Sequence, residues 1–219
     1  MLPRNIDEWF AYAKRIPRDD EDCVILFTGV ERSGKSNTAQ IMLYTLDESF
    51  GVHRIAFNVP SFFDIVADMP KGRAALLDEA KVNNRKAMHR DTVKLNDWLQ
   101  VCGGLNHYLG LCYPRAHRID TLILERMRFN VHMVARGRAV MRTYTGNDDA
   151  PWRELFRFDV GRLPDEYRET YVRAKDEAAR EAIRRERVES DDGVDRLSLT
   201  DELRRLHSDP DARRPKTRL

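Results

Sequence analysis

Cysteine is scarce in this chain. Among 219 residues there are three, Cys23, Cys102 and Cys112, and no two of them form a CxxC pair. An odd number of cysteines without paired spacing argues against a disulfide framework and against a zinc site. Because such cysteine usage suits a reducing compartment, we expect a cytoplasmic protein.

Long apolar runs are absent as well. Nowhere do 18 apolar residues follow one another, and the segment 1–16 contains no uninterrupted apolar run of the length that a signal peptide requires. We therefore expect neither a membrane span nor a signal peptide. The apolar share of 42% is nevertheless enough for a packed core.

Charge is unevenly distributed along the chain, although the formal net charge is only +2. Residues 1–80 contain 9 Lys and Arg against 13 Asp and Glu, whereas residues 81–142 contain 12 against 4. The basic residues are thus concentrated in one central block, where an anionic polymer could be held. A solvated basic surface remains an equally open interpretation.

Apolar segments of strand length alternate with segments of helical periodicity. The predicted strands are residues 23–29, 54–59, 74–80, 107–113 and 130–135, with 138–146 as a hairpin partner. The predicted helices are residues 6–16, 35–46, a helix with Ser61 as its N-cap, 85–103 and 120–127. This alternation predicts an α/β fold with a mostly parallel sheet and helices on both faces.

The composition changes after Pro164, where charged residues dominate and apolar residues become rare. We expect one domain over residues 1–161, of which 1–22 form an N-terminal helix and linker. Residues 162–219 are predicted to be a charged helical tail with many i,i+4 charge pairs and a disordered end.

Residues 29–36 match the phosphate-binding pattern GxxxxGK[ST] in full. A buried strand is predicted before them and a helix after them, which is the context that the pattern requires. Lys35 would reach the β- and γ-phosphates of ATP, and the Ser36 hydroxyl would ligate Mg²⁺. The residues expected to contact the nucleotide are Gly29, Val30, Glu31, Arg32, Ser33, Gly34, Lys35, Ser36 and Asn37.

A second motif lies at the end of the third predicted strand, where Asp78 and Glu79 follow four apolar residues. A carboxylate at this position can hold Mg²⁺ through a water molecule, so Asp78 is the predicted metal residue beside Ser36. Glu79 could orient and deprotonate the attacking water. The predicted catalytic residues are therefore Lys35 and Glu79.

These two motifs together resemble the P-loop NTPases that have an additional strand and a catalytic glutamate. Within that division the chain most resembles the FtsK–HerA group, especially the small genome-packaging ATPases of prokaryotic viruses. The resemblance rests on Asp78-Glu79-Ala80, the Arg-rich segment after it, and the strand–Pro–helix–strand run from His107 to Ala135, and it covers residues 23–146. The fourth strand departs from the family pattern, because it ends in Cys112 and Tyr113 where a Gln or Asn is usual.

The resemblance implies a RecA-like domain that assembles into a homo-oligomeric ring and moves duplex DNA by hydrolysing ATP. It also implies a location in the host cytoplasm or the virion, and a capsid or portal protein as a partner. A ring would need an arginine that reaches the γ-phosphate of a neighbouring subunit. The candidates are Arg115, Arg118, Arg126 and Arg128. For each of them, a surface ion pair or a contact with a nucleic-acid phosphate is the alternative.

Four cations follow the acidic motif on the predicted helix 85–103 and are candidates for binding nucleic acid: Arg85, Lys86, Arg90 and Lys94. Aromatic residues do not alternate with them, so contacts with a duplex backbone are favoured over base stacking.

Two other functions stay open at this point. A small nucleotide or metabolite kinase would explain the phosphate loop, although Glu79 beside Asp78 suits water activation better. A Zot-like ATP-dependent assembly or secretion protein is the other alternative, although such proteins usually carry a membrane span.

Overall fold

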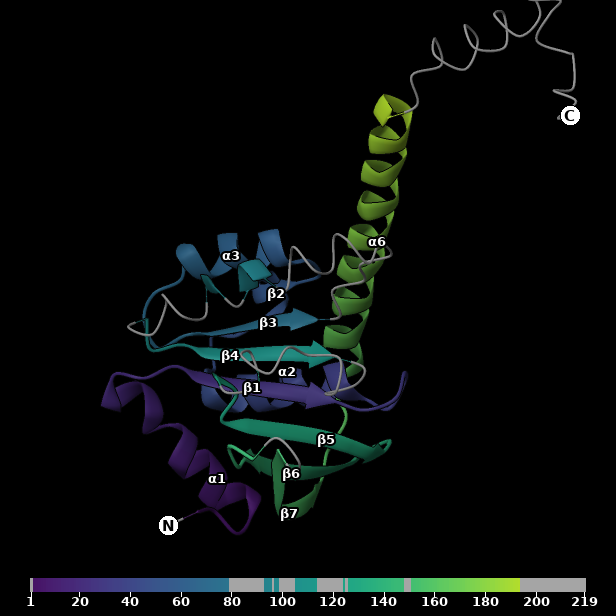
Figure 1. The fold of residues 1–219 in the computed structure, drawn as a ribbon. Helices are drawn as coiled ribbons and strands as arrows, with labels where there is room; N and C mark the ends of the chain where they lie inside the picture. The colour runs from purple at the N-terminus through teal and green to yellow at the C-terminus, as the bar shows by residue number, and fades with distance from the viewer. Residues whose placement is uncertain are drawn as a thin grey trace, which may run out of the picture. The chain divides into compact units, whose positions relative to one another are not determined.

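The computed structural model describes residues 2–78, 93–95, 97–98, 105–113, 124, 126–147 and 151–193, and the side chains of 185–193 are outside this description. Two compact units are found, Met1–Val172 and Arg173–Leu219. The first unit contains a seven-stranded sheet with helices against it (Figure 1).

Seven strands form one sheet in the order β2-β3-β4-β1-β5-β6-β7. Their bounds are β1 Cys23–Thr28, β2 Ile55–Ala56, β3 Ala74–Asp78, β4 Tyr108–Tyr113, β5 Phe129–Ala135, β6 Arg138–Tyr144 and β7 Trp152–Asp159. The first five strands in this order form four parallel pairs, whereas the pairs β5–β6 and β6–β7 are antiparallel. The expected mostly parallel sheet is confirmed.

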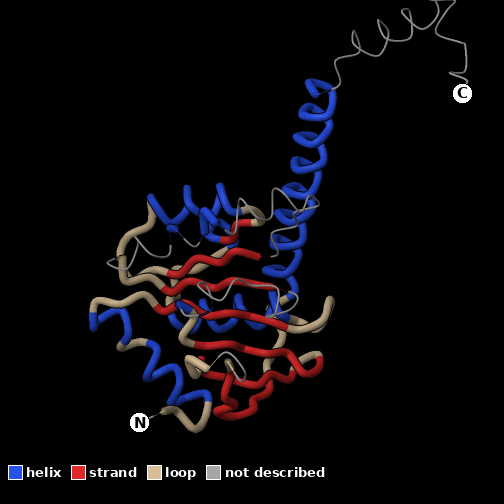
Figure 2. The backbone as a smooth tube through the Cα atoms, viewed as in Figure 1, coloured by secondary structure: helices blue, strands red, loops and turns tan. Residues whose placement is uncertain are grey.

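The helices are α1 Ile6–Ala13, α2 Lys35–Leu46, α3 Val59–Ala67 and α6 Asp165–Gly193, with short 3₁₀ helices at Ile16–Asp19 and Val52–Arg54. Figure 2 shows how the helices, strands and loops succeed one another along the backbone. None of the described helices combines the length and the apolar character needed to cross a bilayer.

Two apolar layers cover the two faces of the sheet. Buried residues of α1 and α2, such as Trp9 and Leu43, pack with alternate residues of β1 on one face. Buried residues of α3, such as Phe62, pack with the intervening strand residues on the other face. The prediction of helices on both faces is therefore confirmed. Because β1 has buried side chains on both faces, its sequence is a continuous apolar run.

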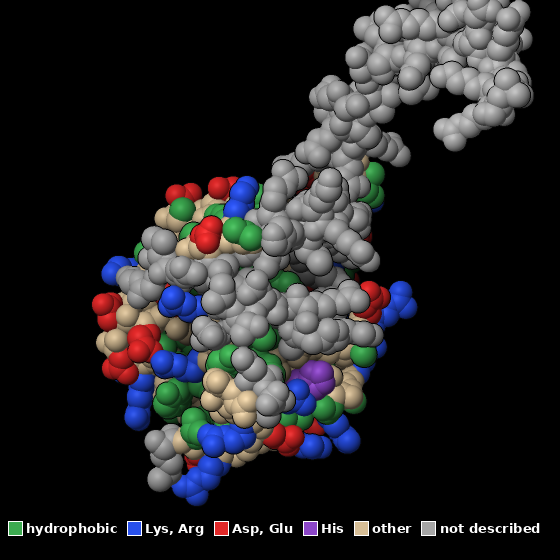
Figure 3. Space-filling view, viewed as in Figure 1, with side chains coloured by type: hydrophobic (Ala, Val, Ile, Leu, Met, Phe, Trp, Pro, Cys, Tyr) green, Lys and Arg blue, Asp and Glu red, His purple; other side chains and the backbone are tan. Residues whose placement is uncertain are grey.

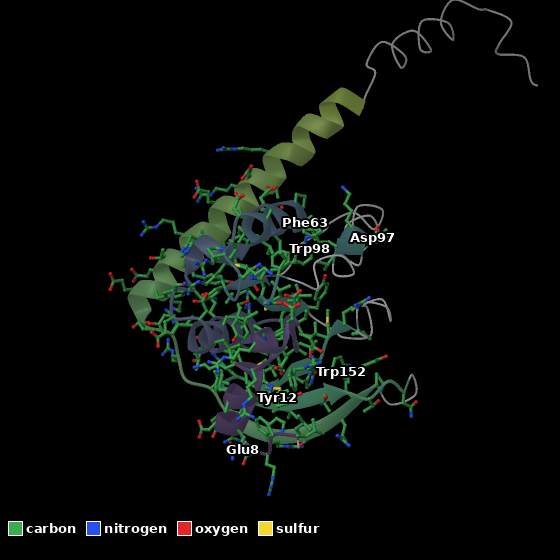
Figure 4. The ribbon with its side chains drawn as sticks, turned by 90° about the vertical axis from the view of Figure 1, so that its left-hand side faces the viewer. Glu8, Tyr12, Phe63, Asp97, Trp98 and Trp152 are labelled. Carbon is green, nitrogen blue, oxygen red and sulfur yellow. The ribbon has the colours of Figure 1, made fainter. Side chains whose placement is uncertain are left out.

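Trp98 anchors part of the α3 layer. Its ring lies 5.3 Å from that of Phe63 and 5.8 Å from that of Phe62, between ring centroids (Figure 4). Such edge-on and tilted contacts add to the stability that burial provides.

Some predicted boundaries are wrong. The predicted N-cap Ser61 lies inside α3, which starts at Val59 and is capped by Asn58, whose side-chain oxygen accepts a hydrogen bond from the Ser61 amide at 2.8 Å. The second strand is confined to Ile55–Ala56, and β7 was not predicted. Strand β7 alternates polar and partly buried side chains and pairs only with β6, so its sequence is weakly apolar.

Candidate functional site

The phosphate loop lies at the carboxyl end of β1. Three residues of the loop have positive φ angles, Gly29 at 142°, Arg32 at 61° and Gly34 at 99°. Gly34 is the N-cap residue of α2, so the helix begins at Lys35 as predicted. The first amides of a helix have no partner within it and carry the positive end of its dipole, which makes this turn suitable for an anion.

Gly29 passes close to the neighbouring strand β5. A Cβ atom placed on Gly29 would lie 2.8 Å from Met133 Cβ and 2.9 Å from Ser33 Oγ. These contacts are shorter than van der Waals packing permits, and Met133 Cβ cannot rotate away. The glycine is therefore required by the approach of the loop to β5.

We expect Gly29→Ala to lower the free energy of unfolding by about 2 kcal/mol or more, because overpacking adds to the cost of a positive φ angle. Gly72→Ala is the matched control, since Gly72 has a φ of 75° with nothing within 4 Å of an added Cβ. Denaturant unfolding of both variants measures the difference. Equal losses of stability in the two variants would show that β5 tolerates the extra atom.

Lys35 is held inside the loop. Its ammonium donates hydrogen bonds to the carbonyl oxygens of Gly29 and Val30, each at 2.9 Å, and the residue is 7% exposed. An ammonium has three protons, so one remains after these two bonds for a phosphate oxygen. The arrangement keeps a positive charge at the centre of the loop.

The other loop residues differ in exposure. Ser33 is buried, and its hydroxyl has no hydrogen-bond partner in the described part of the chain. The side chains of Val30, Glu31 and Arg32 are exposed. A buried hydroxyl without a partner, in the same loop as a lysine ammonium, fits a loop that binds an oxyanion.

Ser36 and Asp78 meet although they come from separate elements. Ser36 lies in the first turn of α2 and Asp78 at the end of β3, and β4 separates β3 from β1. The Ser36 hydroxyl donates a hydrogen bond of 2.7 Å to Asp78 Oδ1. Mg²⁺ prefers hard oxygen ligands and needs only one or two from the protein, so this pair fits it.

Asp78 is completely buried and has a second partner that the sequence did not reveal. The Tyr171 hydroxyl, from the beginning of α6, donates a hydrogen bond to Asp78 Oδ2. Tyr171 is 8% exposed and its ring packs against Phe57, with 6.1 Å between centroids. Tyr171 lies in a charge-rich segment with no local motif, so only the fold brings it to Asp78.

Asn37, which was expected to contact the nucleotide, binds the backbone before α6. Its side-chain nitrogen donates to the Gly161 carbonyl at 2.9 Å, and its side-chain oxygen accepts from the Leu163 amide at 3.1 Å. The segment after β7 is thereby fastened to the first turn of α2.

A polar cluster holds the last residue of β1. The Thr28 hydroxyl lies 3.0 Å from His132 Nδ1. It also accepts a hydrogen bond of 3.0 Å from the side-chain nitrogen of Asn130. Burial, and to a smaller extent the Arg142 guanidinium, lower the pKa of His132, which favours the neutral imidazole. The cluster stabilises the entry to the phosphate loop without adding charge.

Two of the arginine-finger candidates lie far from the loop of their own subunit. Arg126 and Arg128 precede β5, and therefore lie at the amino end of the parallel strands, opposite the phosphate loop. Arg128 forms an ion pair with Glu21 at 2.5 Å. A hollow of about 620 Å³ at this end is lined by both arginines together with Glu21 and Asp22. The hollow is lined by side chains of both charges and lies at the opposite end of the strands from Lys35, so it is not part of the phosphate loop.

The remaining candidates are only partly described. Glu79, Arg85, Lys86, Arg90, Arg115 and Arg118 lie outside the described residues, while Lys94 is exposed. On the described part of the face in Figure 3, Lys and Arg side chains are interspersed with Asp and Glu side chains. No group of three or more His, Cys, Asp or Glu side chains suited to a metal ion is found among the described residues. Burial raises the pKa of the Cys23 thiol to about 12, so it offers no thiolate.

Comparisons with known proteins provide little further information. No protein-family model matches the chain, and no curated protein matches it in sequence. Among solved structures, the chain is similar to the N-terminal domain of zonular occludens toxin from Neisseria meningitidis, with 12% sequence identity and a TM-score of 0.40. That match covers 64% of this chain and 95% of the other. A similarity of this size does not assign a function.

Proposed function

We propose that this chain is a RecA-like P-loop ATPase that binds Mg-ATP at residues 29–36 and hydrolyses it. The observation that carries the proposal is the hydrogen bond between the hydroxyl of Ser36, which follows the loop lysine, and the buried carboxylate of Asp78. The position of β4 between β1 and β3 supports the additional-strand type of P-loop NTPase.

Each residue of the site has a separate task. The loop amides and the start of α2 bind the phosphates, and Lys35 neutralises charge at the β- and γ-phosphates. The Ser36 hydroxyl would ligate Mg²⁺, and Asp78 would hold the ion through a water molecule. Mg²⁺ held by these residues would supply electrostatic stabilisation of the phosphate charge. Glu79, next after the end of β3, accepts the proton of the attacking water.

The proposal extends to translocation of duplex DNA, in the manner of a viral genome-packaging motor. The central block of residues 81–142, with 12 Lys and Arg against 4 Asp and Glu, supports this step. A motor of this kind works as a ring of identical subunits, with a capsid or portal protein as its partner. An arginine from the next subunit would complete each ATP site, and the candidates remain Arg115, Arg118, Arg126 and Arg128.

The decisive experiment measures the ATPase rate of the wild-type chain with and without linear duplex DNA, alongside the mass of the assembled species. The proposal expects hydrolysis that needs Mg²⁺ and rises when DNA is added to an oligomer. Hydrolysis without any response to DNA would retain the ATPase and remove the translocase. Phosphate transfer to a small molecule instead of water would point to a kinase.

We expect neutralisation of the four candidate cations, Arg85, Lys86, Arg90 and Lys94, to weaken binding to duplex DNA. Each lost phosphate contact should reduce the slope of log K against log salt by about 0.9. Fluorescence anisotropy of a labelled duplex at several salt concentrations measures this slope.

The matched control neutralises four exposed arginines of α6: Arg168, Arg173, Arg180 and Arg184. It changes the net charge by the same amount, so it should leave the slope almost unchanged if binding depends on where the cations lie. A wild-type slope in the first variant would leave residues 85–94 as a solvated basic surface.

A further inference from the structure

The segment between β7 and the second turn of α6 lies against the phosphate-binding elements. We call residues 160–172 the strap. Asn37 fastens one end of it through the Gly161 carbonyl and the Leu163 amide. Tyr171 fastens the other end through Asp78, and both Val160 and Tyr171 belong to the apolar cluster that includes α2. The strap thus bridges two elements of the nucleotide site.

Asp78 gains an oriented donor on each of its two oxygens from this arrangement. Its Oδ1 accepts from Ser36 on α2, and its Oδ2 accepts from Tyr171 on the strap. The carboxylate is 0% exposed, so water cannot substitute freely for either donor. A buried carboxylate that loses a donor bears a large desolvation cost and turns toward whatever partner remains.

We propose that Tyr171 is a positioning residue for Asp78, and through it for the Mg²⁺ that accompanies ATP. This inference rests on the proposed ATPase function and adds a residue from beyond the predicted domain to its site. The phenol is a neutral donor, so it orients the carboxylate without cancelling its charge. Each carboxylate oxygen has two lone pairs, so Oδ2 can accept from Tyr171 and from a metal-bound water together.

The ring of Tyr171 has a separate, structural task. It packs against Phe57 and is almost fully buried, so a phenylalanine at this position retains the apolar contact and loses only the hydroxyl. Tyr171→Phe therefore tests the hydrogen bond without opening a cavity in the core.

The experiment measures binding of a fluorescent ATP analogue as Mg²⁺ is titrated, and repeats the measurement in EDTA. We expect Tyr171→Phe to need about tenfold more Mg²⁺ for half-maximal binding, the scale for losing a hydrogen bond to a charged group. Its affinity for the analogue in EDTA should equal that of the wild type, because the phosphate loop is intact. If Tyr171 only stabilised the fold, Tyr171→Phe would change binding with Mg²⁺ and binding in EDTA alike.

Tyr167→Phe is the matched control. Tyr167 lies one turn earlier on α6 and is half-buried, and its hydroxyl has no hydrogen-bond partner among the residues that the structure describes. This variant should bind the analogue with the Mg²⁺ requirement of the wild type. Loss of Mg²⁺ affinity in both variants alike would overturn the assignment to Tyr171.

A double-mutant cycle with Asp78→Asn shows whether Tyr171 acts through Asp78. If it does, Tyr171→Phe should add little in the Asp78→Asn background, since interacting residues are not additive. Independent, additive effects would overturn the proposal, and so would an unchanged or lowered Mg²⁺ requirement in Tyr171→Phe. If the wild type itself shows no Mg²⁺-dependent binding, the proposed function fails together with this inference.

Discussion

Lys35→Ala is expected to abolish ATP hydrolysis and to weaken nucleotide binding. The ammonium lies at the centre of the loop, where it donates hydrogen bonds to the Gly29 and Val30 carbonyls. Because it meets phosphate charge in the ground state and in the transition state, both kcat and affinity should fall. A decrease of about 10²-fold or more in kcat is the scale for losing one preorganised donor.

Lys71→Ala is the control, since Lys71 is an exposed lysine in the turn before β3. A steady-state phosphate-release assay and a nucleotide-binding titration measure the two effects separately, and circular dichroism verifies the fold. Hydrolysis at the parental rate by Lys35→Ala would show that the loop is not the active site, and the proposed function would then be wrong.

Glu79→Gln is expected to bind Mg-ATP with the affinity of the wild type and to lose turnover. The amide is nearly isosteric with the carboxylate, but it cannot accept the proton of the attacking water. Loss of a general base typically costs about 10²-fold to 10⁴-fold in rate. Single-turnover hydrolysis together with equilibrium binding of the nucleotide separates chemistry from affinity.

Asp78→Asn provides the contrast to Glu79→Gln. It should raise the Mg²⁺ concentration required for binding, because Asp78 and Ser36 form the predicted metal site. Wild-type turnover in Glu79→Gln with bound ATP undiminished would place the general base at another residue. The two neighbouring acids are thus distinguished by which step each variant impairs.

Much of the site could be predicted because its residues lie close together along the chain. The pattern at residues 29–36 combines a strand, a turn and a helix start within a few residues, and α2 begins at Lys35 as expected. Local backbone requirements also explain the glycines, since Gly34 has a positive φ angle that glycine adopts without strain. The pairing of Ser36 with Asp78 was predicted from two motifs together, a phosphate loop and an apolar strand that ends in an aspartate.

Predictions failed where the signal was weak or nonlocal. Strand β7 has few buried residues, so its alternation did not distinguish it from a loop. The N-cap of α3 was placed at Ser61, although Asn58 accepts a hydrogen bond at 2.8 Å from the Ser61 amide. Both residue types are good N-caps, but Asn58 has the extended backbone that an N-cap requires, whereas Ser61 already lies within α3.

The sequence by itself determined the mostly parallel α/β sheet, the loop between β1 and α2, and Asp78 at the end of β3, because hydrophobic periodicity and short motifs are local properties. Only the tertiary structure decided that Tyr171 and Asn37 join the strap to this site. The residues in these three contacts are separated by 93, 124 and 126 positions in the chain. The tertiary structure also decided that Arg126 and Arg128 lie at the opposite end of the sheet from the loop of their own subunit. Such placements depend on the order and direction of the strands, which result from packing of the whole sheet and have no signature in any single segment.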